Sequence, residues 1–318
     1  MLTAAGIEAR RRYIGASEVA AIMGLSPFRR DGTPETAATV FWRKRPDLLG
    51  QLAPEEEKPT SAQTRGNVIE WALLKHAEQD LGRPLEEQHV AVGPCGILRA
   101  TLDAWVVGTD EGVEVKSPGR SEDWGDADTD QIPMHYVLQC QAQAYCAGLS
   151  RVWVYALVPG WGGGEIRRYR IERDEDIIGA IVTRCHAFWR DHVEAGVPPE
   201  GGETAPLYLL KRVCRITGKR TDLDDAGRAA VAEWDAIREQ RLAVEKAEEA
   251  AKARVMQAMG DAEWAPWDEG KIIRVQSVST RRIDTEELRK RHPDVAEECT
   301  RVTTSPKLGI VKKPKGLA

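Results

Sequence analysis

The chain has 318 residues, enough for one large domain or two smaller ones. Hydrophobic residues make up 42% and charged residues 30%, which is typical of a globular protein with a buried core. The formal net charge of −5 does not by itself indicate a nucleic-acid-binding protein. The six cysteines form no C-x-x-C pair, which argues against a zinc ribbon and fits a reducing cytosol. We find no signal-peptide core and no apolar run of membrane-spanning length, so no membrane partner is expected.

Positive charge is concentrated near the N-terminus. Residues 1–45 carry eight basic and four acidic side chains. This local excess is compatible with contacts to phosphate groups. On composition alone, a solubilising surface is the simpler explanation.

The segment RRRYIGASEVAAIMG, residues 10–24, predicts a short helix over residues 18–23 with Ser17 as its N-cap. The N–H groups at the helix start and the Ser17 hydroxyl could hold a phosphate, and the arginines at 10–12 lie just upstream. A plain capped helix would explain the same pattern. A second helix is expected over residues 34–44.

Residues 46–64 are rich in Pro and Glu and predict a surface loop. Residues 66–81 then predict an amphipathic helix, and Glu70 falls on its buried edge. A buried carboxylate needs a partner. That partner could be the Arg65 guanidinium or a metal ion.

Residues 98–116 predict two short strands joined by a Gly-rich turn. Glu114 and Lys116 are two apart and share a strand face, and a hairpin would bring Asp103 beside them. Two carboxylates and an ammonium on one face are costly unless they bind something. A divalent cation would account for the carboxylates, and Lys116 would assist a water. A solvated face with a surface ion pair is the simpler explanation of this pattern taken alone.

The remaining elements predict an α/β domain followed by a different composition. We expect helices over residues 133–148 and 177–195 and strands over residues 151–158 and 165–171. Tyr136, Gln139 and Gln143 share one polar stripe of the first of these helices. Their neutral side chains suit contacts to a phosphate or a water, although a polar stripe is usually a solvent face. The order of elements indicates one α/β domain that ends near residue 197.

The domain organisation expected from this pattern has four parts. Residues 1–197 form the α/β domain, and residues 198–223 form a linker. Residues 224–303 form a helical extension with short strands, which begins with a long charged helix. Residues 304–318 form a basic tail that is expected to be disordered.

Four ordered motifs resemble the YqaJ-like viral recombinase family, which includes the phage lambda exonuclease and the RecE-type exonucleases. The motifs are IGASEVAAIMGLSPFR, RGNVIE, LDAWV…GVEVKSP and HYVLQCQAQAY, and the resemblance covers about residues 10–197. It implies an α/β restriction-endonuclease-like PD-(D/E)XK core, with a central mixed sheet flanked by helices and a helical C-terminal extension.

The resemblance also implies an activity. The expected enzyme is a Mg²⁺-dependent 5′-to-3′ exonuclease on linear double-stranded DNA that leaves 3′ overhangs for recombination by strand annealing. Two Mg²⁺ ions are expected, with Mn²⁺ as an alternative. The expected partners are double-stranded DNA ends, a single-strand annealing protein and further copies of the chain in a trimeric or tetrameric ring. The expected location is the cytoplasm of a bacterial host, with a phage or prophage origin.

Motif position implies three groups of site residues. The metal site would comprise Glu70, Asp103 and Glu114 with the Val115 carbonyl. Lys116 would be the catalytic lysine, supported by Tyr136 and Gln139. The 5′-phosphate pocket would comprise Ser17, Thr101 and one arginine among Arg10, Arg11 and Arg12, with Arg120 as a weaker match. Leu102 stands where the signature has proline, which leaves the Asp103 carboxylate in place.

Two other classes of function stay open. One is another nuclease of the same fold, such as a resolvase or an endonuclease. A Cas4-like exonuclease is disfavoured, because it would need clustered cysteines. The other class is a non-catalytic DNA-end-binding or scaffold protein, against which the intact set of Asp103, Glu114 and Lys116 argues.

Overall fold

The computed structural model describes residues 4–50, 61–160, 164–213, 220–268, 271–275, 285–300 and 309. The chain divides into two compact units, Met1–Arg215 and Ile216–Ala318. All of the candidate site residues belong to the first unit.

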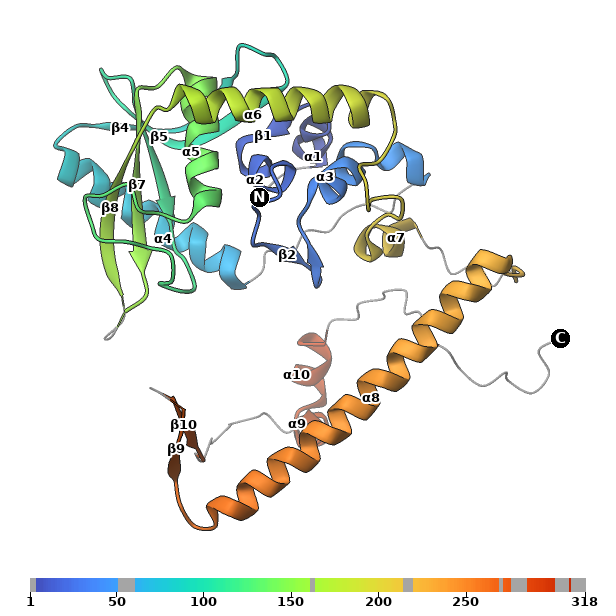
Figure 1. The fold of residues 1–318 in the computed structure, drawn as a ribbon. Coiled ribbons are helices and arrows are strands. Elements are labelled where there is room, and N and C mark those ends of the chain that lie inside the picture. The colour runs from blue at the N-terminus through green and yellow to red at the C-terminus, as the bar shows by residue number, and fades with distance from the viewer. Residues whose placement is uncertain are drawn as a thin grey trace. The chain divides into compact units, whose positions relative to one another are not determined.

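The first unit alternates helices and strands (Figure 1). Its helices are α1 (Ala4–Arg10), α2 (Val19–Ile22), α3 (Ala37–Lys44), α4 (Ser61–Leu81), α5 (Met134–Ala147), α6 (Glu175–Phe188) and α7 (Leu207–Val213). Shorter helical turns are η1 (Ala16–Glu18), η2 (Pro46–Leu49) and η3 (Trp189–Glu194). The strands are β1 (Ile14–Gly15), β2 (Arg29–Arg30), β3 (Thr33–Pro34), β4 (Leu85–Val92), β5 (Leu98–Val106), β6 (Glu111–Lys116), β7 (Arg151–Val158) and β8 (Glu165–Glu172).

A mixed sheet of six strands organises this unit. Its order is β1-β5-β6-β7-β8, and β4 also pairs with β5. The pairs β1–β5 and β6–β7 are parallel, and the other neighbours are antiparallel. Helix α5 connects the parallel strands β6 and β7, as such a crossover requires. The predicted α/β class with a central mixed sheet is therefore confirmed.

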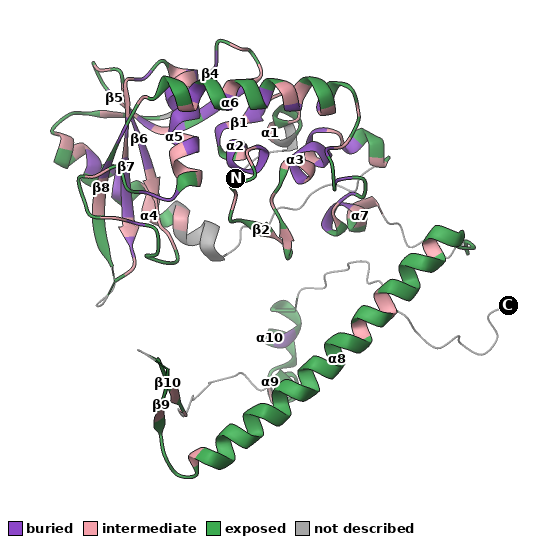
Figure 2. Ribbon diagram, in the orientation of Figure 1, coloured by how far each residue is buried: buried purple, intermediate pink, exposed green. Residues whose placement is uncertain are grey.

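Helices α4 and α5 cover opposite faces of the sheet. Val154 of β7 packs in one core cluster with Cys140 of α5, whereas Tyr155 packs in another with Leu74 of α4. Successive side chains of a strand point to opposite faces, so the two helices lie on either side of β7. Figure 2 shows the buried residues gathered along the strands and the inward sides of these helices. Burying each such apolar side chain stabilises the fold by about 1.5–3 kcal/mol.

Two helices differ clearly from the bounds predicted for them, the one expected over residues 18–23 and the one expected over residues 66–81. The first is split into the turn η1 and helix α2, so Ser17 lies inside a 3₁₀ turn. The Glu18 carboxylate bridges this tighter turn by accepting the Gly15 N–H over 2.9 Å. The helix predicted over residues 66–81 is α4, which begins earlier, at Ser61, within the stretch 46–64 predicted as a loop. Helix propensities are weak enough that Gly66 does not stop the helix.

The first unit extends past the boundary predicted at residue 197. Tyr208 and Leu209 of α7 are buried in the same core as Ile14, and Trp42 Nε1 donates to the Gly202 carbonyl over 2.8 Å. Residues 198–213 were predicted as linker from their Pro- and Gly-rich composition, but their described part packs on this unit. Residues 214–219 lie outside the described residues.

The second unit begins with helix α8 (Asp225–Met259), whose N-cap Asp224 accepts the Gly227 N–H over 2.7 Å. No residue of α8 is buried (Figure 2). Strands β9 (Trp264–Asp268) and β10 (Lys271–Arg274) pair antiparallel, and helices α9 (Thr285–Arg291) and α10 (Pro293–Glu298) follow. The predicted tail, residues 304–318, lies outside the described residues except for residue 309. Of the described helices, none is long and apolar enough to cross a membrane.

Candidate active site

Strands β5 and β6 bring Asp103 and Glu114 together. The register pairs Ala104 with Val113, which makes Asp103 and Glu114 the next neighbours along the two strands. Asp103 Oδ2 accepts the Val115 N–H over 2.8 Å. Among the described residues, no donor reaches the other oxygen, Oδ1. Burial and the nearby Glu114 carboxylate raise the pKa of Asp103 to about 8.

Glu114 is a buried carboxylate, 3% exposed, and helix α5 supplies most of its partners. Gln139 Nε2 donates to its Oε1 over 2.7 Å, and Gln143 Nε2 donates to its Oε2 over 2.6 Å. The Lys116 ammonium also pairs with Oε1. Three donors on a buried carboxylate offset the cost of removing it from water.

Lys116 is held between this carboxylate and an aromatic ring. Its Nζ lies 4.9 Å from the Tyr136 ring centroid and 3.4 Å from Gln139 Oε1. Burial alone would lower the pKa of Lys116, but the carboxylates of Glu114 and Asp103 outweigh it and raise the pKa above its ordinary value. The side chain is therefore a charged donor, suited to stabilising negative charge rather than to accepting a proton.

Glu70 of α4 faces the same carboxylates across a cavity of about 240 Å³, which Val115, Lys116 and Ser117 also line. Burial, and next the Glu114 charge, raise the pKa of Glu70. Across the described residues, no three His, Cys, Asp or Glu side chains converge closely enough to hold a metal ion. The Arg65 side chain lies outside the described residues, so a Glu70–Arg65 pair stays untested.

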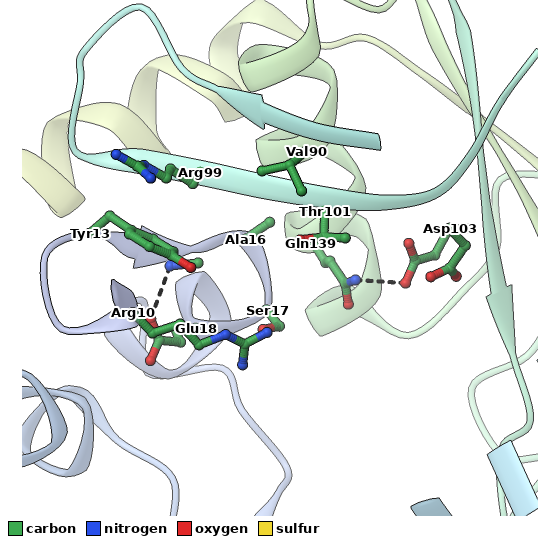
Figure 3. A pocket seen from close by; sticks show the side chains of 12 residues that line it. Arg10, Tyr13, Ala16, Ser17, Glu18, Val90, Arg99, Thr101, Asp103 and Gln139 are labelled. Carbon is green, nitrogen blue, oxygen red and sulfur yellow. Dashed lines mark hydrogen bonds between the residues drawn. The ribbon is translucent and has the colours of Figure 1, made fainter. Parts of the chain in front are cut away.

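A second cavity, of about 280 Å³, opens on the other side of Asp103 and Glu114 (Figure 3). Its lining residues are Arg10, Tyr13, Gly15, Ala16, Ser17, Glu18, Val90, Arg99, Thr101, Asp103, Glu114 and Gln139. Three of the predicted 5′-phosphate residues, Arg10, Ser17 and Thr101, thus share one cavity with the acidic pair. Arg12 and Arg120 are exposed and are not among the residues that line it.

The cavity is acidic at one end and carries basic groups toward the other. Arg99, Thr101 and Asp103 are two apart on β5 and all line it. Figure 3 shows Arg99 directed away from Asp103, with Tyr13 beside it. The Arg99 guanidinium lies 4.7 Å from the Tyr13 ring centroid, and its buried Nε has no partner among the described atoms.

Sequence reasoning missed Arg99 and Tyr13, and it left Gln143 out of the site although Gln143 shares the polar stripe of Tyr136 and Gln139. Arg99 could have been found from its spacing to Thr101 and Asp103. Gln143 could have been found because it lies one helical turn beyond Gln139. Tyr13 carries no local signal, since only the tertiary fold places its ring beside Arg99.

Residues 7–150 match the model of the YqaJ-like viral recombinase domain. This match confirms the resemblance recognised from the four motifs. The chain is also similar to the protein YqaJ of Bacillus subtilis (strain 168), with 27% identity over 314 residues, covering 95% of this chain and 92% of that protein.

Two solved structures are similar to part of this chain. One is the alkaline exonuclease LHK-Exo of Laribacter hongkongensis, at 22% identity and a TM-score of 0.46, covering 61% of this chain and 94% of that one. The other is a phage related exonuclease from Haemophilus somnus 129PT, at 14% identity and a TM-score of 0.44, covering 57% and 94%.

The partners of Glu114 predict the effect of Gln143→Leu. The variant leaves the buried Oε2 without its donor, so the free energy of unfolding should fall by about 1–3 kcal/mol. Urea denaturation measures this. The matched control is Gln79→Leu on the exposed side of α4, which should change stability by less than about 0.5 kcal/mol. Equal stability of the two variants would contradict the role given to Gln143.

Proposed function

We propose that this chain is a metal-dependent exonuclease that digests linear double-stranded DNA from 5′ to 3′. The products would be 3′ single-stranded overhangs for phage-type recombination by strand annealing. The observation that best supports this is the single cavity that contains Arg10, Ser17 and Thr101 together with Asp103 and Glu114. Groups suited to a terminal phosphate and groups suited to a metal thus border one space.

The donor set fits a hard divalent cation. Mg²⁺ prefers oxygen ligands, and Asp103 keeps one oxygen free of protein donors among the described residues. Burial and, next, repulsion by the Glu114 carboxylate raise the pKa of Asp103, and a bound cation would relieve that repulsion. Asp103, Glu114, Glu70 and the Val115 carbonyl would hold two Mg²⁺ ions, with Mn²⁺ as an alternative, once Glu70 moves nearer to the two strand carboxylates than it lies in this structure. When bound, the ions would activate a water and stabilise the negative charge of phosphodiester hydrolysis.

The protein side chains would supply orientation and fixed charge. Glu114 is held in one position by Gln139 and Gln143. The Lys116 ammonium, over the Tyr136 ring, would donate to an oxygen that gains negative charge in the transition state. Preorganised donors of this kind lower the barrier because they do not need to reorient during the reaction.

The basic end of the cavity would select a DNA end. A terminal phosphate monoester carries a charge of about −1.5 to −2 at neutral pH, more than an internal phosphodiester. Arg10 would bind it through charge-assisted hydrogen bonds, and the hydroxyls of Ser17 and Thr101 would donate further ones. Arg12 and Arg120 are exposed and would contact the DNA backbone outside the cavity.

The resemblance supports the remaining proposals. The chain would act as a trimeric or tetrameric ring, deliver its product to a single-strand annealing protein and work in the cytoplasm of a bacterial host. The competing proposal is a DNA-end-binding or scaffold protein without catalysis, or another nuclease of the same fold. Cleavage assays separate them.

Lys116→Ala tests the catalytic assignment. With Mg²⁺, the variant should lose at least about 100-fold in the rate of digestion of linear duplex DNA. Its DNA affinity should persist, because other cationic groups remain. The matched control is Lys75→Ala, which removes an exposed lysine of α4 paired with Glu78, and should digest at the wild-type rate. Wild-type digestion by Lys116→Ala would sink the assignment.

Arg10→Gln tests the end-binding pocket. Wild-type protein should digest 5′-phosphorylated duplex faster than 5′-hydroxyl duplex. Loss of one charged hydrogen-bond donor should reduce that preference by at least about 10-fold. The control is Arg190→Gln, an exposed arginine that pairs with Asp191, which should keep the preference. Indifference of the wild-type protein to the 5′ group would remove the pocket from the account.

A further inference from the structure

A buried lysine outside the cavity contacts the segment that carries its phosphate-binding groups. The side chain of Lys44, at the end of α3, is 2% exposed. A buried ammonium is costly unless acceptors surround it. Within the described part of the chain, the acceptors of the Lys44 ammonium come from residues 10–18, the segment that contains Arg10 and Ser17.

Lys44 contacts this segment at both ends and in the middle. Its Nζ donates to the Arg10 carbonyl over 2.8 Å and to Glu18 Oε2 over 2.5 Å. It also lies 5.8 Å from the Tyr13 ring centroid. Glu18 Oε2 in turn accepts the Gly15 N–H over 2.9 Å. One ammonium therefore fixes the separation between the residue that starts the segment and the turn that presents Ser17.

Lys44 also balances a charge that would oppose phosphate binding. Glu18 lines the cavity, and an uncompensated carboxylate there would repel a phosphate. The Lys44 ammonium neutralises it at short range, and Arg43 approaches its other oxygen at 3.7 Å. Arg43 itself pairs with Glu35 at 2.5 Å. The four charges compensate one another, and among the described residues no carboxylate forms an ion pair with the Arg10 guanidinium of the cavity.

We infer that Lys44 is a positioning residue for recognition of the DNA end. It fixes the Arg10 backbone relative to Ser17, and it cancels the Glu18 charge that faces the terminal phosphate. This inference rests on the proposed function. It adds a residue from α3 that does not line the cavity and that no motif includes.

Stability alone does not account for this arrangement. Replacing a buried ion pair by apolar side chains of similar volume is often neutral or stabilising. The neighbouring side chains Phe41 and Val40 show that α3 already packs an apolar core. A buried ion pair also defines the geometry of the groups that it joins. Here Lys44 joins the Glu18 carboxylate to the Arg10 carbonyl.

The test is the preference for a 5′-phosphate over a 5′-hydroxyl end in Lys44→Met. Two readouts apply to the full chain: the ratio of kcat/KM for the two linear duplexes with Mg²⁺, and the ratio of their affinities in EDTA. We expect both ratios to fall by about 10-fold, because displaced groups lose much of their effect on the bound phosphate. A purely structural loss would lower activity on both duplexes equally and leave the ratios unchanged.

Arg45→Gln is the matched control. It removes the cation next to Lys44, which pairs with Asp47 and has no described contact with Glu18 or the Arg10 carbonyl, so the ratios should stay near wild type. If Lys44→Met does not accumulate as folded protein, Lys44→Met/Glu18→Gln carries the test, since it buries no unpaired charge. Its ratios should remain below those of Glu18→Gln alone, because the bond to the Arg10 carbonyl is still missing.

The outcomes separate the inference from the proposed function. Wild-type ratios in Lys44→Met, or a double variant equal to Glu18→Gln, would overturn the role of Lys44 while leaving the exonuclease proposal intact. A wild-type protein that digests DNA without distinguishing the two ends would overturn both the pocket and this inference. A wild-type protein that digests neither duplex would overturn the exonuclease proposal itself.

Discussion

The buried carboxylate of Glu114 is the constraint on which the site depends. It comes from β6, but two of its donors, Gln139 and Gln143, come from α5. The helix must therefore pack in one register on the sheet, since a shift would leave a charge buried without partners. That register also places the Tyr136 ring against the Lys116 ammonium. The chemistry of the site and the packing of its main helix thus share the same contacts.

Two cavities border the carboxylate pair Asp103 and Glu114. One opens toward Glu70 on α4, and the other opens toward Arg10 and Ser17 on the N-terminal segment. Because α4 and α5 cover opposite faces of the sheet, the acidic pair lies where several layers meet. Lys44 plays a comparable part in the second cavity, because its buried ion pair with Glu18 holds the N-terminal segment against α3. The carboxylates suited to a metal are thus held by contacts to α5, whereas the segment suited to a phosphate is held by contacts to α3.

The sequence predicted elements whose signals are local. Strand β7 has the predicted bounds because β-branched and aromatic residues fill it, and the β5–β6 hairpin follows from its turn residues. Contacts between segments far apart in the chain could not be predicted from the sequence. Lys44 and Arg10 are 34 residues apart, and Gln143 and Glu114 are 29 apart, so no periodicity connects them. The Pro- and Gly-rich composition also led to a predicted domain boundary at residue 197. That boundary is too early, because Leu209 packs in the core of the first unit.

The most direct test of the account is digestion of linear duplex DNA labelled at one defined end of one strand, with Mg²⁺ present. The account predicts that a 5′ label is released at once as a mononucleotide, while a 3′ label stays on long single strands. Release of the 3′ label first, cuts inside the duplex, or binding without cleavage would contradict it. The same reaction with Asp103→Asn should release neither label, because that substitution removes a carboxylate shared by both cavities.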